Sequence, residues 1–138
     1  INEIAHRHGA QCVVASIDVR AQDSGWACFS HAGQQATGRE VVTWARELQD
    51  RGAGEILITS IDRDGTMQGY DLDLIREVSA AVGIPVIASG GCSGYPDMQR
   101  AIEAGASAVA AGALFQFTDA TPREAATYLH QVGIEARL

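Results

Sequence analysis

Four short apolar runs recur along the chain about every 30 residues, and amphipathic segments separate them. The runs cover residues 11–17, 54–61, 84–89 and 106–112, and the helical patterns cover 38–50, 71–82 and 95–104. A helix tail over Ile1–His8 precedes the first run, and a final helix opens with a capping box at Thr121-Pro122-Arg123-Glu124. This alternation is typical of an α/β fold built on a parallel sheet.

The number of strand–helix units predicts half of a (β/α)₈ barrel, the TIM fold. A closed barrel of this kind has eight strands and about 250 residues, whereas the 138 residues here supply four predicted strands. We therefore expect residues 1–138 to form a single (β/α)₄ half-barrel domain. A small hairpin is expected as an insertion at about residues 26–37.

A half-barrel leaves two strand edges and one sheet face without cover. We expect the chain to associate with itself, as a homodimer that rebuilds eight strands or as a larger homo-oligomer. The face that a second copy would cover is predicted to hold alternate apolar residues of three strands, namely Val13, Ala15, Ile56, Ile58, Val86 and Ala88.

Two of the apolar runs end in glycine-rich turns. One run leads into Ser89-Gly90-Gly91, and the next leads into Gly112-Ala113. Without side chains at the glycines, backbone amides can approach an anion closely. A single turn of this kind is ordinary, but two in succession match the way the last two strands of a barrel build a phosphate site. The pair predicts phosphate binding at these five residues.

Polar residues follow the other two predicted strands. Asp18 ends the first strand, where it either caps a turn or transfers protons. We favour proton transfer because parallel α/β folds keep catalytic residues at strand carboxyl ends.

The second strand ends in the polar residues Thr59, Asp64 and Gly65. They are predicted to contact substrate, the alternative being an exposed Asp-Gly turn. Arg63 is expected to contact either a phosphate or a surface carboxylate.

Composition narrows the possible partners. A net charge of −7 argues against nucleic acid, whose phosphates need a basic face, and no apolar stretch is long enough for a membrane span. The cysteines and histidines lack ligand spacing, so neither a metal nor a cofactor is expected. Cys92 has no neighbouring base and is not expected to be a nucleophile. These features indicate a cytoplasmic protein with a small substrate.

Several segments together resemble a known family. Residues 52–66 (GAGEILITSIDRDGT), 69–71 (GYD), 87–91 (IASGG) and 133–138 (GIEARL) are similar to the cyclase subunit of imidazole glycerol phosphate synthase, of histidine biosynthesis. The resemblance extends over essentially the whole chain but covers only the carboxyl-terminal half of that family's barrel. The sister isomerase, which makes the cyclase substrate, shares part of these motifs, and the ending favours the cyclase.

The resemblance implies a role for each predicted site residue. Family members close a ring in a bisphosphorylated ribotide with ammonia from a glutaminase partner, and two Asp residues act as general acid and base. Asp18 matches the second of these acids, and Glu55, otherwise a solvated strand start, matches the ammonia gate. Ala113 stands where many members have Ser, so one hydroxyl contact to phosphate is missing. The resemblance supports substrate contacts at Thr59, Asp64 and Gly65 and one of two phosphate sites at Ser89, Gly90, Gly91, Gly112 and Ala113.

The same resemblance limits what the chain is expected to do alone. The other acid and the second phosphate site belong to the other half of the family's barrel. We expect the chain to bind a phosphorylated ribotide or inorganic phosphate and to show little or no cyclase activity. In a homodimer, Asp18 of the second copy would replace the missing acid, and a glutaminase partner is expected only with a full barrel. The alternatives are a non-catalytic phosphate-binding or structural half-barrel, and the isomerase.

Overall fold

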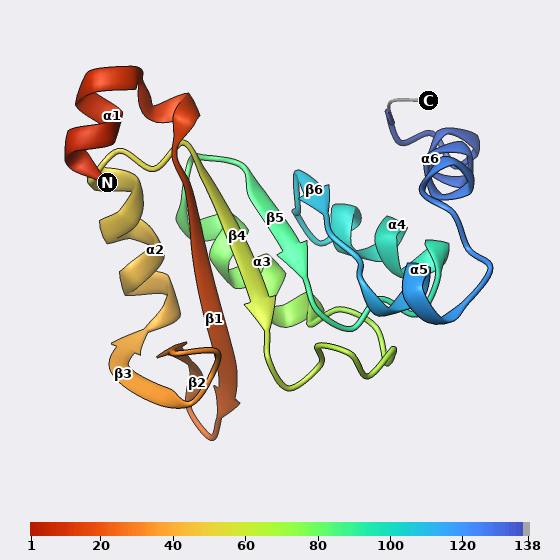
Figure 1. Ribbon diagram of the computed structural model, residues 1–138, viewed down its shortest axis with the longest axis horizontal. Helices are drawn as coiled ribbons and strands as arrows, with labels where there is room; N and C mark the ends of the chain where they lie inside the picture. The colour runs from red at the N-terminus through yellow and green to blue at the C-terminus, as the bar shows by residue number, and fades with distance from the viewer. Residues whose placement is uncertain (137–138) are drawn as a thin grey trace.

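The central feature of the computed structural model, which describes residues 1–136, is an open sheet of six strands (Figure 1). Its parallel strands lie in the order β1 (Val14–Gln22), β4 (Glu55–Ser60), β5 (Val86–Ser89) and β6 (Ala108–Val109). An antiparallel hairpin, β2 (Gly25–Ser30) and β3 (Gln35–Glu40), continues the sheet beyond β1. Parallel strands with helical crossovers in an unclosed sheet confirm the predicted α/β half-barrel class.

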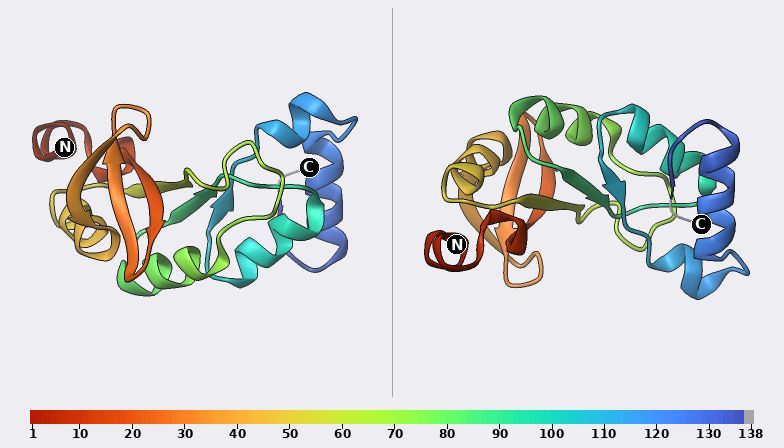
Figure 2. Two further views of the ribbon diagram at one scale, coloured as in Figure 1. Left: turned by 90° about the horizontal axis from the view of Figure 1, so that it is seen from below. Right: turned by 90° about the horizontal axis from the view of Figure 1, so that it is seen from above.

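Three helices, α2 (Val41–Asp50), α3 (Leu72–Ala81) and α4 (Tyr95–Glu103), lie between the strands in the chain and cover one side of the sheet. The other helices are α1 (Asn2–His8), which precedes β1 with a short 3-10 turn at Ala10–Cys12, and α5 (Ala113–Phe117) and α6 (Pro122–Gln131), which follow β6. Figure 2 shows α2, α3 and α4 along one side, while α6 lies beyond β6. Within residues 1–136, the helices are too short or too polar to cross a membrane.

Side chains at the helix N-termini fix where the helices begin. Glu40 accepts hydrogen bonds of 2.7 and 2.8 Å from two amides in the first turn of α2. Asp71 caps α3 in the same way, with one bond of 3.1 Å. The capping box predicted at Thr121 and Glu124 is present at the start of α6. These three helices therefore start where a side chain satisfies unpaired amides of the first turn.

Three predicted boundaries differ from the structure. The strand predicted over residues 11–17 is β1, which runs from Val14 to Gln22, so Asp18 lies inside the strand and does not end it, because residues 18–22 stay extended and pair with β2. The helix predicted over residues 38–50 begins at Val41, because residues 35–40 stay extended and pair with β2. The strand predicted over residues 106–112 contains only Ala108–Val109, because only these two residues have register partners in β5.

The face of the sheet that the helices cover is the one predicted to be open. Val13, Ala15, Ile56, Ile58, Val86 and Ala88 are at most 7% exposed, because apolar residues of α2, α3 and α4 pack on them. The prediction that these residues await a second copy is wrong. The uncovered face holds the alternate residues Val14, Ser16, Asp18, Leu57, Thr59, Ile87 and Ser89. Val14 is 52% exposed on this face.

Three strand edges have no neighbour within the described residues, and one of them is the outer edge of β3. β2 pairs with residues 18–22 of β1 and leaves residues 14–17 without a partner on that side. β6 ends the sheet on the other side. The helices that precede β1 and follow β6 in the chain carry exposed apolar side chains, with Ile4 of α1 at 51% exposure and Phe117 of α5 at 75%. The edges of β1 and β6 are suited to further pairing.

Candidate active site

Three predicted site residues lie in one row across three parallel strands. Asp18 of β1 is the register partner of Thr59 of β4, and Thr59 is the partner of Ser89 of β5. Neighbouring strands lie about 4.8 Å apart, and residues in one row of a parallel sheet point to the same face. The row lies on the open face of the sheet, where Thr59 and Ser89 are within the last two residues of β4 and β5, whereas Asp18 stands in the middle of β1. All three residues are half-buried.

The carboxylate of Asp18 makes no hydrogen bond or ion pair with residues 1–136. The nearby Arg20 forms an ion pair with Asp62 and not with Asp18, since the Arg20 Nε lies 3.2 Å from Asp62 Oδ1. The Asp62 carboxylate also accepts a bond of 2.9 Å from the amide of Ala21. Asp62 therefore holds the end of β1 in place, while the half-buried carboxylate of Asp18 has no hydrogen-bond partner within the described residues.

The glycine turn after β5 needs glycine for two reasons. Gly90 and Gly91 have φ values of 94° and 98°, a region that other residues rarely adopt. A Cβ on Gly90 would lie 2.6 Å from the carbonyl oxygen of Ser60, and one on Gly91 would overlap that of Gly69. Gly112 differs, because its φ is −112° and a Cβ there would meet no atom within 4 Å. Only the first turn is sterically fixed.

Both glycine turns line one small cavity of about 20 Å³. Its walls are Asp64, Gly65, Ser89, Gly90, Gly91, Cys92, Ala110, Ala111, Gly112 and Ala113. In residues 1–136, the amides of Gly91, Cys92, Ala111 and Gly112 donate no hydrogen bond to the chain. Unpaired amides around one cavity can bind an anion. The structure thus brings together all the predicted phosphate residues, together with two predicted substrate contacts.

The loop between β4 and α3 supplies the rest of this rim. Gly65 has a φ of 75°, which forms a tight turn beside the exposed side chain of Asp64. Arg63 turns away from the cavity, and its guanidinium donates to the carbonyls of Gln68 and Gly69 at 3.5 and 3.3 Å. Within the described residues Arg63 makes no ion pair with a carboxylate, and its contact with a phosphate stays a prediction.

Glu55 lies on the open face but at the opposite end of the sheet. It is the register partner of Val14, four residues before Thr59 on the same strand. At about 3.3 Å per residue, Glu55 lies about 13 Å from the row of Asp18 and Thr59. The face therefore carries a carboxylate near each end.

Cys92 is buried beside the cavity at 4% exposure. Burial raises the pKa of its thiol, although a bond to Tyr70 partly offsets this effect. The thiolate of Cys92 is therefore disfavoured. Within the described residues, no three His, Cys, Asp or Glu side chains are grouped in a way that could hold a metal ion.

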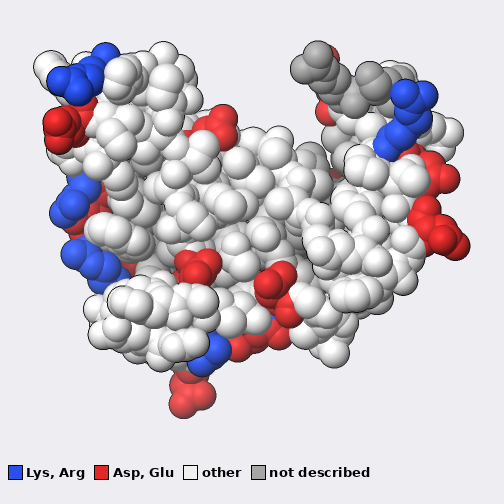
Figure 3. Space-filling model, viewed as in Figure 1, with Lys and Arg blue, Asp and Glu red and all other residues white. Residues whose placement is uncertain are grey.

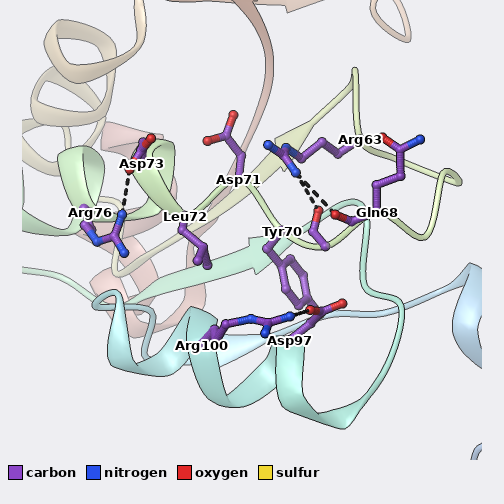
Figure 4. A pocket seen from close by; sticks show the side chains of 10 residues that line it. Arg63, Gln68, Tyr70, Asp71, Leu72, Asp73, Arg76, Asp97 and Arg100 are labelled. Carbon is purple, nitrogen blue, oxygen red and sulfur yellow. Dashed lines mark hydrogen bonds and ion pairs between the residues drawn. The ribbon is translucent and has the colours of Figure 1, made fainter.

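A second, larger cavity of about 340 Å³ lies between the β4–α3 loop, α3 and α4 (Figure 4). Its charges are largely compensated within the chain, since Asp73 pairs with Arg76 at 2.6 Å and Asp97 pairs with Arg100. Asp18 and the glycine turns do not line it. We therefore place the candidate site at the smaller cavity.

The charge distribution also bears on the candidate site. Figure 3 shows the open face as mostly uncharged, with acidic groups toward the carboxyl ends of the strands. The ten cationic residues of the chain are all arginines, and none of them lines the small cavity in the described structure. An anion there would be held by neutral amides rather than by a positive charge.

Sequence reasoning missed two buried side chains that support the glycine turns. Tyr70 donates a hydrogen bond of 2.8 Å to the carbonyl of Ala110. Asp97 accepts one of 2.8 Å from the amide of Ser93, just after the first turn. The Gly69-Tyr70-Asp71 motif was the available signal for Tyr70, but its contact across 40 residues could not be derived from spacing.

The fold and the strand-end residues define a class of protein, a half-barrel with its polar residues gathered at the carboxyl ends of parallel strands. A family described as "Histidine biosynthesis protein" matches residues 1–121, and the chain belongs to this family. It is 49% identical over 138 residues to the imidazole glycerol phosphate synthase subunit HisF of Hyphomonas neptunium, covering 99% of this chain and 55% of that protein.

These findings confirm the resemblance drawn from the motifs. The chain spans about half the length of the curated relative that it matches. Of the ending used for the resemblance, residues 137–138 lie outside the described residues.

Proposed function

We propose that this chain supplies the carboxyl-terminal half of a cyclase site of the imidazole glycerol phosphate synthase type. The observation that carries the proposal is the row of Asp18, Thr59 and Ser89 on the open face, next to two glycine turns around one cavity. A carboxylate, hydroxyl-binding groups and an anion site are what ring closure in a phosphorylated ribotide requires. The identity of 49% to a HisF subunit supports this chemistry.

Each group has a separate part in the proposed reaction. Asp18 transfers a proton to or from a carbon or nitrogen of the substrate, a role typically worth about 10²–10⁴-fold in rate. Thr59, Asp64 and Gly65 contact the substrate beside it. The amides around Ser89, Gly90, Gly91, Gly112 and Ala113 hold one phosphate, which fixes the distance between that phosphate and Asp18.

The proposed site needs a complementary half-barrel. One carboxylate and one phosphate site do not match a bisphosphorylated substrate that requires an acid and a base. We therefore expect little or no cyclase activity from the isolated chain. With a full barrel, Glu55 would stand at the ammonia entrance on the far end of the same face, and a glutaminase partner would supply the ammonia.

A second copy of the chain is one source of the complementary half. The open edge of β1 at residues 14–17 and the outer edge of β6 are each available for pairing. Joining them in a two-fold dimer would close eight parallel strands and cover Val14, Leu57 and Ile87. Asp18 of the second copy would then provide the second acid.

Two other functions fit part of the same observations. The sister isomerase also uses paired acids and phosphate sites, so product analysis after supplying substrate and ammonium salt separates it from a cyclase. A non-catalytic half-barrel would bind phosphate and remain inactive even after a complementary half is supplied.

The phosphate site is tested by titrating the ¹⁵N-labelled chain with inorganic phosphate at constant ionic strength. We expect saturable shifts of the amides of Gly90, Gly91 and Gly112. Gly54 and Gly105, which precede strands at the other end of the sheet, serve as internal controls and should stay unchanged. An absence of shifts at the strand-end glycines, or equal shifts at the control glycines, would contradict the proposal.

A further inference from the structure

A two-residue segment of the β4–α3 loop contacts both glycine turns. The amide of Gly69 donates to the carbonyl of Gly91 at 2.7 Å. The phenol of Tyr70, only 4% exposed, donates to the carbonyl of Ala110 at 2.8 Å. Gly91 belongs to the turn after β5, and Ala110 begins the turn after β6. The two turns are therefore joined through Gly69 and Tyr70.

The geometry of the peptide bond gives these contacts a consequence for the amides. In a trans peptide, the C=O and the following N–H point in opposite directions, and the described chain contains no cis peptide bond. When Gly69 binds the carbonyl of Gly91, the amide of Cys92 is directed away from the Gly69–Tyr70 segment. The bond from Tyr70 to Ala110 directs the amide of Ala111 away in the same manner.

Both of these amides belong to residues that line the small cavity. Neither amide donates a hydrogen bond within residues 1–136. A buried amide without a partner is rare in proteins and calls for a ligand or water. Cys92 is 4% exposed, so its amide has little access to bulk solvent.

Tyr70 is well suited to remain a donor. Burial raises the pKa of its phenol far above the ordinary value, so the hydroxyl keeps its proton at all physiological pH values. The ring belongs to the apolar cluster with Ile75, Met98 and Leu114, which restrains its position. The Ala110 carbonyl therefore has a fixed donor.

We propose that Tyr70 is a positioning residue for anion binding. Its hydroxyl orients the Ala110–Ala111 peptide so that the Ala111 amide can donate a hydrogen bond to the same anion that the Gly90–Cys92 turn binds. Tyr70 does not touch the anion itself. The inference rests on the proposed phosphate site and adds the residue that couples its two turns.

The direct test compares Tyr70→Phe with a matched control, Tyr128→Phe. Tyr128 also donates one hydrogen bond, of 2.9 Å to Gln99 Oε1, and it lies in the same part of the fold without contacting the glycine turns. Each variant thus loses one tyrosine hydroxyl. Inorganic phosphate is titrated into the unmodified chain and both variants, and urea unfolding of each variant measures its stability.

We expect Tyr70→Phe to weaken phosphate binding about fivefold or more, the fold-change that corresponds to one hydrogen bond. Tyr128→Phe should bind within about twofold of the unmodified chain, although it loses a comparable hydrogen bond. Equal phosphate affinity in Tyr70→Phe and the unmodified chain would overturn the role of Tyr70 and leave the phosphate site standing. No phosphate binding by the unmodified chain would instead overturn the proposed function, and the inference with it.

A second measurement needs no variant and so does not depend on the folding of Tyr70→Phe. In the unmodified chain, the ring resonances of Tyr70 should shift with the same phosphate midpoint as the amide of Ala111. Those of Tyr128 should not move. An unchanged Tyr70 ring at phosphate saturation would contradict the coupling.

Discussion

Asp97 is the one charged side chain that is buried in the described residues, at 4% exposure. It accepts bonds of 2.8 and 2.5 Å from the amide and hydroxyl of Ser93 and pairs with Arg100. Burial on its own would raise the pKa of this carboxyl, but the Ser93 and Arg100 donors outweigh it and hold the pKa below its usual value. A carboxyl of this kind stabilises the folded state above its unfolded pKa of about 3.9 and loses that effect as pH falls through its folded pKa.

The contribution of Asp97 can be measured against an exposed counterpart. Asp73 makes the same i,i+3 pair with Arg76 in the first turn of α3, but its side chain is 81% exposed. We expect Asp97→Asn to lower the free energy of unfolding at neutral pH by about 1–3 kcal/mol, and Asp73→Asn by less than about 1 kcal/mol. Urea unfolding followed by circular dichroism measures both. The Asp97→Asn effect should shrink in acid below the folded pKa, and equal or pH-independent losses in the two variants would contradict this account.

Individual site residues differ in how far the sequence predicts their positions. Asp18, Thr59 and Ser89 could be placed at one edge of the sheet because the carboxyl ends of parallel strands meet there. Their alignment in a single row depends on register, which the sequence does not specify. The contacts of Tyr70 and Asp97 depend on how loops pack after the strands pair, so no local pattern reveals them.

At the scale of elements, the main error concerns which face of β1 is covered. The strand reads Val13-Val14-Ala15-Ser16-Ile17, with apolar residues on both faces at its start. Alternation therefore gives little information on which face receives the helices. The structure resolves this through α2 and α3, whose apolar stripes pack on Val13, Ala15 and Ile17. The strand–helix order itself was predictable, since α2, α3 and α6 have a capping residue and the helices between the strands have an amphipathic stripe.

The free edge of β1 gives a prediction at the same scale. Val14, 52% exposed, stands where a second copy would pair, and a lysine at a strand edge opposes such pairing. We expect the unmodified chain to be a dimer and Val14→Lys to weaken its dimerisation about tenfold or more, measured by analytical ultracentrifugation. Ala80→Lys adds the same charge at an exposed position of α3 and should leave the dimer unchanged. An unmodified chain that stays monomeric at micromolar concentration would rule out the dimer.

At the scale of the whole molecule, helices cover one face of the sheet and leave the other face uncovered. Two apolar clusters fill the space between the sheet and its helices, so the half-barrel has a core of its own. The other face carries Asp18, Thr59 and Ser89 at one end and Glu55 at the other, where a closed barrel would have its interior. Under the proposed function, we expect these polar residues to act on a substrate only when a complementary half closes the barrel.

The most direct test of this account is the rate of imidazole glycerol phosphate formation after a complementary half is supplied. The chain is combined with the amino-terminal half of the Hyphomonas neptunium relative, and the cyclase substrate and ammonium salt are added. We expect turnover that the chain alone does not give, and a loss of about 10²-fold or more in Asp18→Asn. Asp23→Asn, at an exposed position just after β1, should keep the rate of the unmodified chain. Turnover that is retained in Asp18→Asn, or absent from a complex in which both halves are shown to associate, would contradict the central claim.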